Sequence, residues 1–254
     1  MLKQGSPIKI AVGVLALGLA ACSQPDGLSE FHDPFEAHNR QVHEFNKNLD
    51  RMFVRPVGEV ANELPDEITI PVSNFADNVG LPNAVVNNVL QGDLGGAITN
   101  TVRFGLNTTL GIGGFFDPAS AFGIYEQEAD FGQTLAVWGV GEGAYLEIVG
   151  LGPTTERDAF GTLVDLVMDP IGQVGTKAQV TYALPSEIAG LAISRGQFSG
   201  TVDSVLYESA DSYAQSRLLY LQNRRFQLGV EADDTYLDPY SDPYFDPYSD
   251  PYEE

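Results

Sequence analysis

The spacing of apolar residues predicts helices along most of this chain. The first helix begins near Asp33, an N-cap candidate that is followed by Pro34. We expect it to end before Pro56, because proline disfavours the helical conformation in the residue that precedes it. Its apolar stripe comprises Phe35, Val42, Phe45, Leu49 and Met52. One face of this helix is therefore expected to pack against other elements.

Further helices and one hairpin follow from the same pattern. Pro65 and Pro71 are expected to bracket a loop. Predicted helices then cover residues 72–79, 82–91, 93–110 with Asp93 as cap, a short segment after Asp117, 131–140, 154–168, a segment from 186 onward, and 201–228 up to Gly229. Residues 144–150 have strand character and run into Gly152-Pro153, which favours a small hairpin. The chain is therefore expected to be mainly α.

The first 22 residues have the pattern of a bacterial lipoprotein signal. Two lysines precede an apolar run at residues 10–21, and Leu19-Ala20-Ala21-Cys22 forms a lipobox. The apolar run is shorter than the ~20 residues that span a bilayer. We therefore expect a signal peptide at 1–21, lipidation of Cys22 and a tether at 22–32. Ser23 is not the aspartate that retains lipoproteins in the inner membrane, which favours the outer membrane. The alternative is a buried core cysteine.

Charge is abundant but unevenly distributed. The formal net charge of −22 excludes nucleic-acid binding through phosphate neutralisation. Between residues 85 and 125, only Asp93, Arg103 and Asp117 are charged, so this stretch is expected to be core or to face lipid. The tail at 230–254 repeats Asp-Pro-Tyr every four residues. Proline at that spacing prevents helix formation, so we expect a disordered acidic tail.

Motifs for enzyme chemistry are missing from the sequence. It contains no phosphate-binding loop, no dinucleotide fingerprint and no Gly-x-Ser-x-Gly elbow. A catalytic triad assembled from distant residues would need His32, His38 or His43. His38 and His43 are five residues apart, whereas a zinc-binding helix places its histidines four apart. We therefore expect no enzyme, no metal and no cofactor.

An ordered series of short motifs resembles the MlaA (VacJ) family of outer-membrane lipoproteins. The series comprises Asp33-Pro34-Phe35-Glu36, Asn39-Arg40, Phe45-Asn46, Arg55-Pro56-Val57, Ser73-Asn74-Phe75, Asn87 to Asp93, Arg103-Phe104, Leu106-Asn107-Thr108, Gly111 to Phe115, Thr134-Leu135, Trp138 to Gly141, Gly143-Ala144-Tyr145, Gly152-Pro153 and Arg157-Asp158. The likeness is close over 33–170 and looser over 200–228. It implies a family domain at 33–229.

The resemblance implies a fold and a function. The fold is a ring of helices embedded in the inner leaflet of the outer membrane, at its periplasmic face, with a central amphipathic channel. Through this channel, phospholipids mislocalised in the outer leaflet pass to a periplasmic lipid-carrier protein, which maintains lipid asymmetry. The resemblance also implies a trimeric porin as partner. An envelope scaffold without transport activity is the alternative, and a membrane-bound lipid hydrolase is a third.

Seven residues are candidates for the site. Arg103 and Arg157 could steer a phosphate, although each could instead form a structural ion pair. Asn107 lies on a Gly-, Asn- and Thr-rich helix that offers a lipid both polar and apolar contacts. The lipid-path candidates are Arg103, Asn107, Trp138, Tyr145 and Arg157, of which the two aromatic residues suit interfacial depth. Phe45 and Asn46 are candidates for supporting the ring, with ordinary core packing as the alternative.

Overall fold

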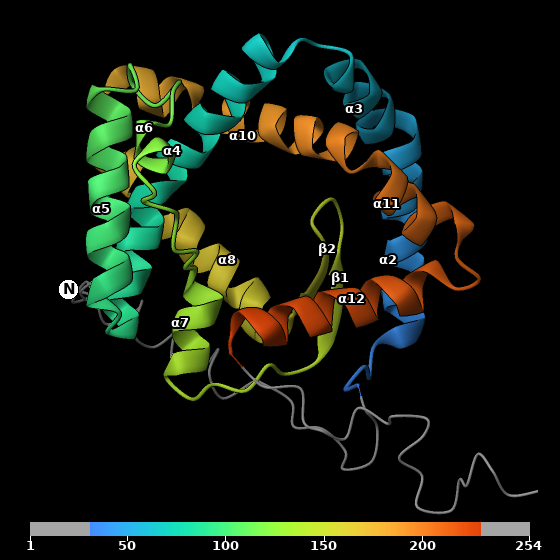
Figure 1. The fold of residues 1–254 in the computed structure, drawn as a ribbon. Helices are drawn as coiled ribbons and strands as arrows, with labels where there is room; N and C mark the ends of the chain where they lie inside the picture. Colours follow the sequence, from blue (N-terminus) through green and yellow to red (C-terminus); the bar gives the residue numbers. More distant parts are fainter. Residues whose placement is uncertain (1–30, 230–254) are drawn as a thin grey trace, which may run out of the picture.

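The computed structural model describes residues 31–229, in which helices follow one another around a central opening (Figure 1). The prediction of a mainly helical fold with one small hairpin is confirmed. The predicted signal peptide, the lipidation site Cys22, nearly all of the tether and the acidic tail lie outside the described residues. No helix within residues 31–229 is both long enough and apolar enough to cross a membrane.

The described elements form two halves of the chain that pack against each other around the ring (Figure 1). The first half comprises α2 (Glu36–Leu49), the π-helix η1 (Asp50–Val54), α3 (Arg55–Asn62), α4 (Asp66–Gln91), α5 (Leu94–Thr109), α6 (Pro118–Ala121) and α7 (Phe131–Val137). The second half comprises β1 (Tyr145–Ile148), β2 (Gly152–Thr155), α8 (Glu156–Met168), α9 (Pro170–Val174), α10 (Lys177–Gln197), α11 (Ser199–Asp203), the π-helix η2 (Ser204–Glu208) and α12 (Ser212–Gln227).

The first helical segment differs from the prediction at both ends. It does not stop before Pro56, because η1 continues the helical path and Pro56 lies in the first turn of α3. A proline there removes an N–H that has no partner within the helix in any case. At the other end, α2 has no side-chain cap. Asp33 instead accepts a hydrogen bond from Asn39 at 3.0 Å.

Proline was a poor guide to the ends of two further helices. The loop expected between Pro65 and Pro71, and the two short helices expected after it, are one helix, α4, with Pro71 and Pro82 in its interior. Its neighbours α5 and α10 pack along it, and this packing offsets the backbone hydrogen bonds that proline removes. Helix α10 begins at Lys177, well before residue 186, and also contains a proline. The segment at 201–228 is interrupted before α12.

Several local predictions are confirmed. Asp93, Asp117 and Thr155 each accept a backbone N–H bond at the start of α5, α6 and α8. Strands β1 and β2 form an antiparallel hairpin, with Tyr145 opposite Thr155 and Ile148 opposite Gly152. In the view of Figure 1 the hairpin extends toward the central opening. The caps and the hairpin were predictable because each depends on residues close in sequence.

Glycine pairs allow two helix crossings in the ring. A Cβ built on Gly196 of α10 would lie 2.3 Å from the carbonyl oxygen of Gly58 in α3. A Cβ built on Gly161 of α8 would lie 2.4 Å from the amide nitrogen of Gly132 in α7. Larger side chains at these positions would push the helix backbones apart. The close approach of α3 to α10 and of α7 to α8 therefore depends on these glycines.

Amides as well as apolar side chains hold the helices together. The buried asparagines are Asn39, Asn78, Asn87, Asn88, Asn100 and Asn107. Asn100 of α5 donates to Asn88 of α4 at 2.9 Å. Asn87 of α4 donates to Asp165 of α8 at 2.9 Å and accepts from Thr134 of α7 at the same distance. Because the amides of Asn87 and Asn100 have partners, they bridge helices without leaving their own buried polar groups unsatisfied.

Candidate functional site

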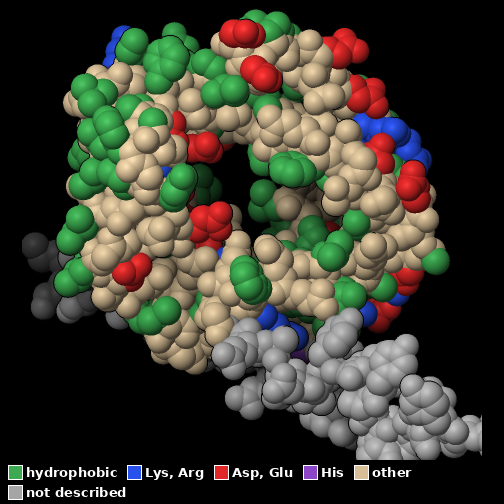
Figure 2. Space-filling view, viewed as in Figure 1, with side chains coloured by type: hydrophobic (Ala, Val, Ile, Leu, Met, Phe, Trp, Pro, Cys, Tyr) green, Lys and Arg blue, Asp and Glu red, His purple; other side chains and the backbone are tan. Residues whose placement is uncertain are grey.

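The central opening remains when all side-chain atoms are drawn (Figure 2). Hydrophobic and acidic side chains both border it in this view. A phospholipid combines apolar tails with a polar head group. A channel for such a molecule therefore requires both apolar and polar walls. We take the opening and the elements that surround it as the candidate functional site.

Helix α5 exposes its apolar side and buries its polar side. Ile98 and Leu110 have exposed fractions of 65 % and 63 %, whereas Asn100, Arg103 and Asn107 are buried. In a water-soluble protein the arrangement is the reverse. Exposed large apolar side chains also occur on α3 (Val57, Val60), α8 (Leu163, Leu166, Val167) and α10 (Val180, Leu184, Ile188, Leu191). Exposed apolar side chains in such numbers are typical of proteins that contact a membrane or another protein.

Two of the lipid-path candidates lie together on the buried side of α5. Arg103 donates to Asp117 and Ser120, both at 3.1 Å, and to the carbonyl of Ile124. Asn107 donates to the other oxygen of Asp117 at 2.9 Å. Burial raises the pKa of Asp117. Hydrogen bonds from Ser120 and Asn107, together with the charge of Arg103, outweigh this effect and lower the pKa overall. Arg103 and Asn107 thus fasten α5 to the start of α6.

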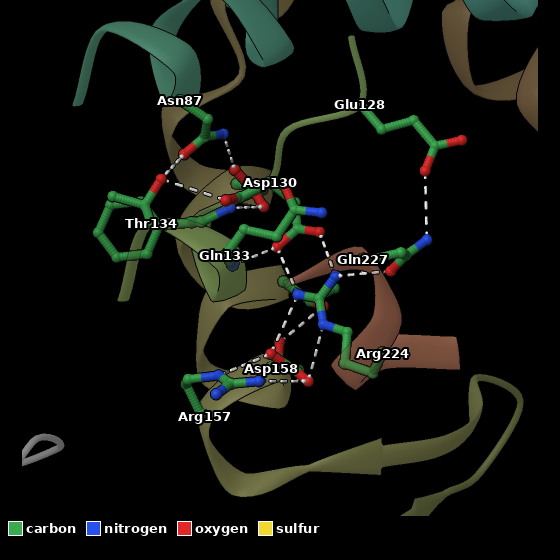
Figure 3. Close-up of polar contacts among 12 residues, drawn as sticks. Asn87, Glu128, Asp130, Gln133, Thr134, Arg157, Asp158, Arg224 and Gln227 are labelled. Atoms are coloured by element: carbon green, nitrogen blue, oxygen red, sulfur yellow. Dashed lines mark hydrogen bonds and ion pairs between the residues drawn. The ribbon is translucent and has the colours of Figure 1, made fainter. Parts of the chain in front are cut away.

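The third candidate, Arg157, belongs to a polar network where α7, α8 and α12 meet (Figure 3). Arg157 donates to the neighbouring Asp158 at 3.0 Å. Arg224 of α12 bonds both oxygens of Asp130 at 2.7 Å and both oxygens of Asp158 at 3.0 and 3.1 Å. Tyr220 adds a bond to Asp158 at 2.8 Å. The network joins the C-terminal helix to α7 and α8.

The ends of α12 lie at two junctions of the ring. Near its C-terminus are Arg224 and also Arg225, which pairs with Glu142 at 2.7 Å. Near its N-terminus, Asp211 pairs with Arg40 of α2 at 2.9 Å. These pairs, formed by residues far apart in sequence, close the circle between the last helix and the first. Arg224 and Arg225 lie in the last turn of α12, and nothing in the sequence indicated their partners.

A third junction joins α10 to the first helical segment. Arg195 donates to both oxygens of Asp50 at 2.8 and 2.9 Å and to Asp203 at 2.6 Å. Tyr207 also donates to Asp50 at 2.7 Å, and this bond together with burial raises the pKa of Tyr207 to about 12. Burial raises the pKa of Asp50, but the bonds from Arg195 and Tyr207 lower it overall.

The two aromatic candidates lie in opposite environments. Trp138 is half exposed, and its indole N–H donates to the carbonyl of Leu90 at 3.1 Å. Tyr145 has an exposed fraction of 0 %. Its ring meets Tyr213 edge-on, and its hydroxyl donates to Glu147 at 2.8 Å. Tyr145 therefore has no surface available to a lipid in this structure, contrary to the expectation of interfacial depth, because it fills the core beneath the hairpin.

Asn46 holds the hairpin to α2. Its amide donates to the carbonyl of Ile148 at 2.9 Å and accepts from the N–H of Gly150 at 2.8 Å. About two helical turns earlier, Asn39 donates to the carbonyl of Tyr145 at 3.0 Å and accepts from the N–H of Glu147 at 3.1 Å. Phe45, in contrast, is half exposed. Of the two ring-support candidates, only Asn46 makes a direct bond to the hairpin.

Replacing Asn46 by alanine is expected to loosen the hairpin turn without unfolding the ring. Two hydrogen bonds are lost, each worth about 0.5–1.5 kcal/mol. Hydrogen exchange of the Gly150 amide should accelerate by about tenfold or more, because each 1.4 kcal/mol corresponds to a factor of ten. The matched control is Asn48→Ala on the exposed side of the same helix. Equal exchange of Gly150 in both variants would contradict the assigned role of Asn46.

The ion-paired aspartates predict loss of stability in acid. Asp158 and Asp50 have pKa values below their ordinary 3.8, because arginine bonds outweigh the effect of burial. A lowered folded-state pKa gives stability that is complete above pH 3.8 and is lost as pH falls through the folded value. The urea midpoint should therefore drop as the pH falls below about 4. The midpoint should drop less in the Asp158→Asn variant than in the wild type. Identical pH profiles of the two proteins would contradict the stabilising role of Asp158.

The sequence of this chain is similar to the sequences of known proteins. The family model described as MlaA lipoprotein matches residues 31–227. An uncharacterized protein of Rickettsia bellii is 34% identical over 80% of this chain and 79% of its own length. The intermembrane phospholipid transport system lipoprotein MlaA of Escherichia coli strain K12 is 32% identical over 86% of this chain and 89% of its own.

A solved structure agrees with these sequence matches. It is described as "Structural basis for maintenance of bacterial outer membrane lipid asymmetry", and one of its chains superposes with a TM-score of 0.66 at 31% identity. The superposition covers 77% of the present chain and 98% of the other. Sequence and structure therefore give the same assignment over nearly all the described residues. The chain belongs to the MlaA lipoprotein family.

Proposed function

We propose that this protein removes mislocalised phospholipids from the outer leaflet of the outer membrane and passes them through its central opening to a periplasmic lipid carrier. The inverted helix α5 carries the proposal. Its apolar side chains face outward while its amides and arginine are buried. Such a helix is stable where acyl chains surround it, which supports a position of the ring among the lipid tails of one leaflet.

The opening supports passage of a molecule with two chemical faces. Apolar and acidic side chains border it (Figure 2). The hairpin tip adds apolar surface, with Val149 and Leu151 exposed at 57 % and 69 %. These features match the head group and the tails of a phospholipid. Movement of the lipid then needs no nucleotide site in this chain.

Attachment and partners complete the proposal. Lipidated Cys22 would tether the ring to the outer membrane from the periplasmic side, and a trimeric porin would be its neighbour there. The E. coli relative is named as a lipoprotein of an intermembrane phospholipid transport system. A carrier protein on the periplasmic side fits such a system. The account requires neither a metal nor a cofactor.

Deletion of the gene tests the proposal directly. Phospholipid in the outer leaflet of the host is measured by chemical labelling of surface amines on intact cells. Deletion should increase the labelled phospholipid, and a plasmid copy of the wild-type gene should restore the original level. An outer leaflet that is unchanged on deletion would contradict transport and would favour an envelope scaffold.

A further inference from the structure

Outside the opening, the fold assembles a serine, a histidine and a carboxylate in a chain of hydrogen bonds. The Oγ of Ser212 lies 3.1 Å from Nε2 of His43, and Nδ1 of the same imidazole lies 3.1 Å from Oε1 of Glu147. The three residues come from α12, α2 and β1. All three are at least nine-tenths buried, with exposed fractions of 7 %, 4 % and 5 %.

The carboxylate determines the tautomer of the imidazole. An ionised Glu147 can only accept, so Nδ1 of His43 carries the proton and donates it to Oε1. Nε2 is then the acceptor for the hydroxyl proton of Ser212. Tyr145 donates to the same Oε1 at 2.8 Å and fixes the carboxylate. This is the arrangement of nucleophile, base and orienting group that activates serine in hydrolases.

A cavity lies next to the serine. Its volume is about 410 Å³, and Ser212 and His43 both line it. The remaining walls are mostly polar and carry Arg40, Glu44, Lys47, Ser209 and Asp211. A volume of this order accommodates a small molecule. A fatty acyl chain would need apolar walls, so the cavity suits a short-chain, hydrophilic ester.

We propose that Ser212, His43 and Glu147 form a serine-esterase site for short-chain carboxylic esters, independent of lipid passage. Ser212 Oγ attacks the carbonyl carbon while its proton passes to Nε2 of His43. The ester C–O bond then breaks, and the leaving alcohol takes that proton. Water attacks the acyl-serine, gives its proton to His43 and releases the carboxylic acid. His43 returns the proton to Ser212.

One cation is in reach of the negative charge that develops on the carbonyl oxygen. The Nζ of Lys47 lies 3.4 Å from Oγ of Ser212. The backbone N–H groups in the first turn of α12 contribute less to stabilising this charge, because the N–H of Ala214 already donates to Asp211 at 3.1 Å. Lys47 is therefore the group assigned to the oxyanion, as a positive charge placed where charge accumulates.

Active-site labelling of the purified full-length protein in detergent tests this site. A fluorophosphonate probe should label the wild type at Ser212 and hydrolysis of p-nitrophenyl acetate should exceed that of the palmitate ester. The rate of probe labelling and the rate of acetate-ester hydrolysis should both fall about 10²–10⁴-fold in Ser212→Ala and His43→Ala. Ser204→Ala is the matched control, since Ser204 does not line the cavity and donates to the carbonyl of Thr201.

Each further outcome decides one part of the assignment. Labelling of the wild type no greater than that of Ser212→Ala overturns the site. Faster hydrolysis of the palmitate ester overturns the short-chain assignment. Restoration of His43→Ala by added imidazole supports the base, because a merely structural histidine would not be rescued.

The positioning role of Glu147 has its own readout. Glu147→Gln should lower the labelling rate and move its rise to lower pH, because the amide no longer stabilises the imidazolium of His43. The other charged groups facing this histidine are Arg40, Glu44 and Lys47 on α2 and Asp211 before α12, and they are unchanged in the variant. A pH profile identical to that of the wild type would overturn the role.

Discussion

Replacing Arg224 by methionine should cost the ring about 3–5 kcal/mol of unfolding free energy, the usual loss when one partner of a buried ion pair is removed. Arg224 holds both Asp130 and Asp158, and its side chain is only 11 % exposed. Without it, Asp158 keeps a buried charge with one arginine partner fewer. The resulting gap lies where α12 meets α7 and α8. For a domain of this size the melting temperature should fall by about 6–20 °C.

The neighbouring arginine supplies the control. Arg225 pairs with Glu142, and both side chains are about one-third exposed. Water screens such a pair, so Arg225→Met should cost about 0–1 kcal/mol. Calorimetry or circular dichroism of the two purified variants separates the two cases. Equal melting temperatures would mean that Arg224 does not close the ring.

Changing Cys22 to serine should remove the proposed covalent anchor and abolish the proposed lipid transport. Each methylene of an acyl chain buried in the bilayer contributes about 0.8 kcal/mol, so the loss far exceeds any single contact in the protein. Cells expressing the variant should incorporate no alkyne-tagged palmitate into this protein. They should also show as much surface phospholipid as the deletion strain.

A substitution at the neighbouring residue tests whether the effect is specific to Cys22. Ser23→Ala keeps the proposed acylation site Cys22, and we expect normal labelling and normal lipid asymmetry. Fractionation of the envelope gives a second measurement. A Cys22→Ser variant found entirely in the outer membrane, with normal asymmetry, would show that the apolar surface of the ring is a sufficient anchor.

Local sequence signals predicted the parts of the fold that depend on neighbouring residues. The caps at Asp93, Asp117 and Thr155 and the hairpin were identified because their partners lie within a few residues. Proline did not mark a helix end at position 56 or inside α4, since tertiary packing offsets a missing hydrogen bond. The start of α10 had a signal that was overlooked: Thr176 and Gln179 form a capping box.

The site was predictable only in part. The family motifs indicated Asn46, which does bond the hairpin. They also indicated Arg103 and Arg157, for which the alternative of a structural ion pair describes the observed contacts. The partners of Arg224 lie 66 and 94 residues away, and no periodicity encodes such pairs. Nor did spacing predict that α5 would turn its apolar stripe outward, because amphipathicity alone does not say which side faces the core.

Photocrosslinking at the hairpin tip tests the central claim most directly. A benzophenone side chain placed at Val149 or Leu151, both exposed beside the opening, should capture phospholipid in living cells. Ile98 on the outer side of α5 should also capture lipid, whereas Gln41 on α2 should not. Passage through the ring predicts lipid adducts at the hairpin tip. Adducts at Ile98 but none at Val149 or Leu151 would contradict it.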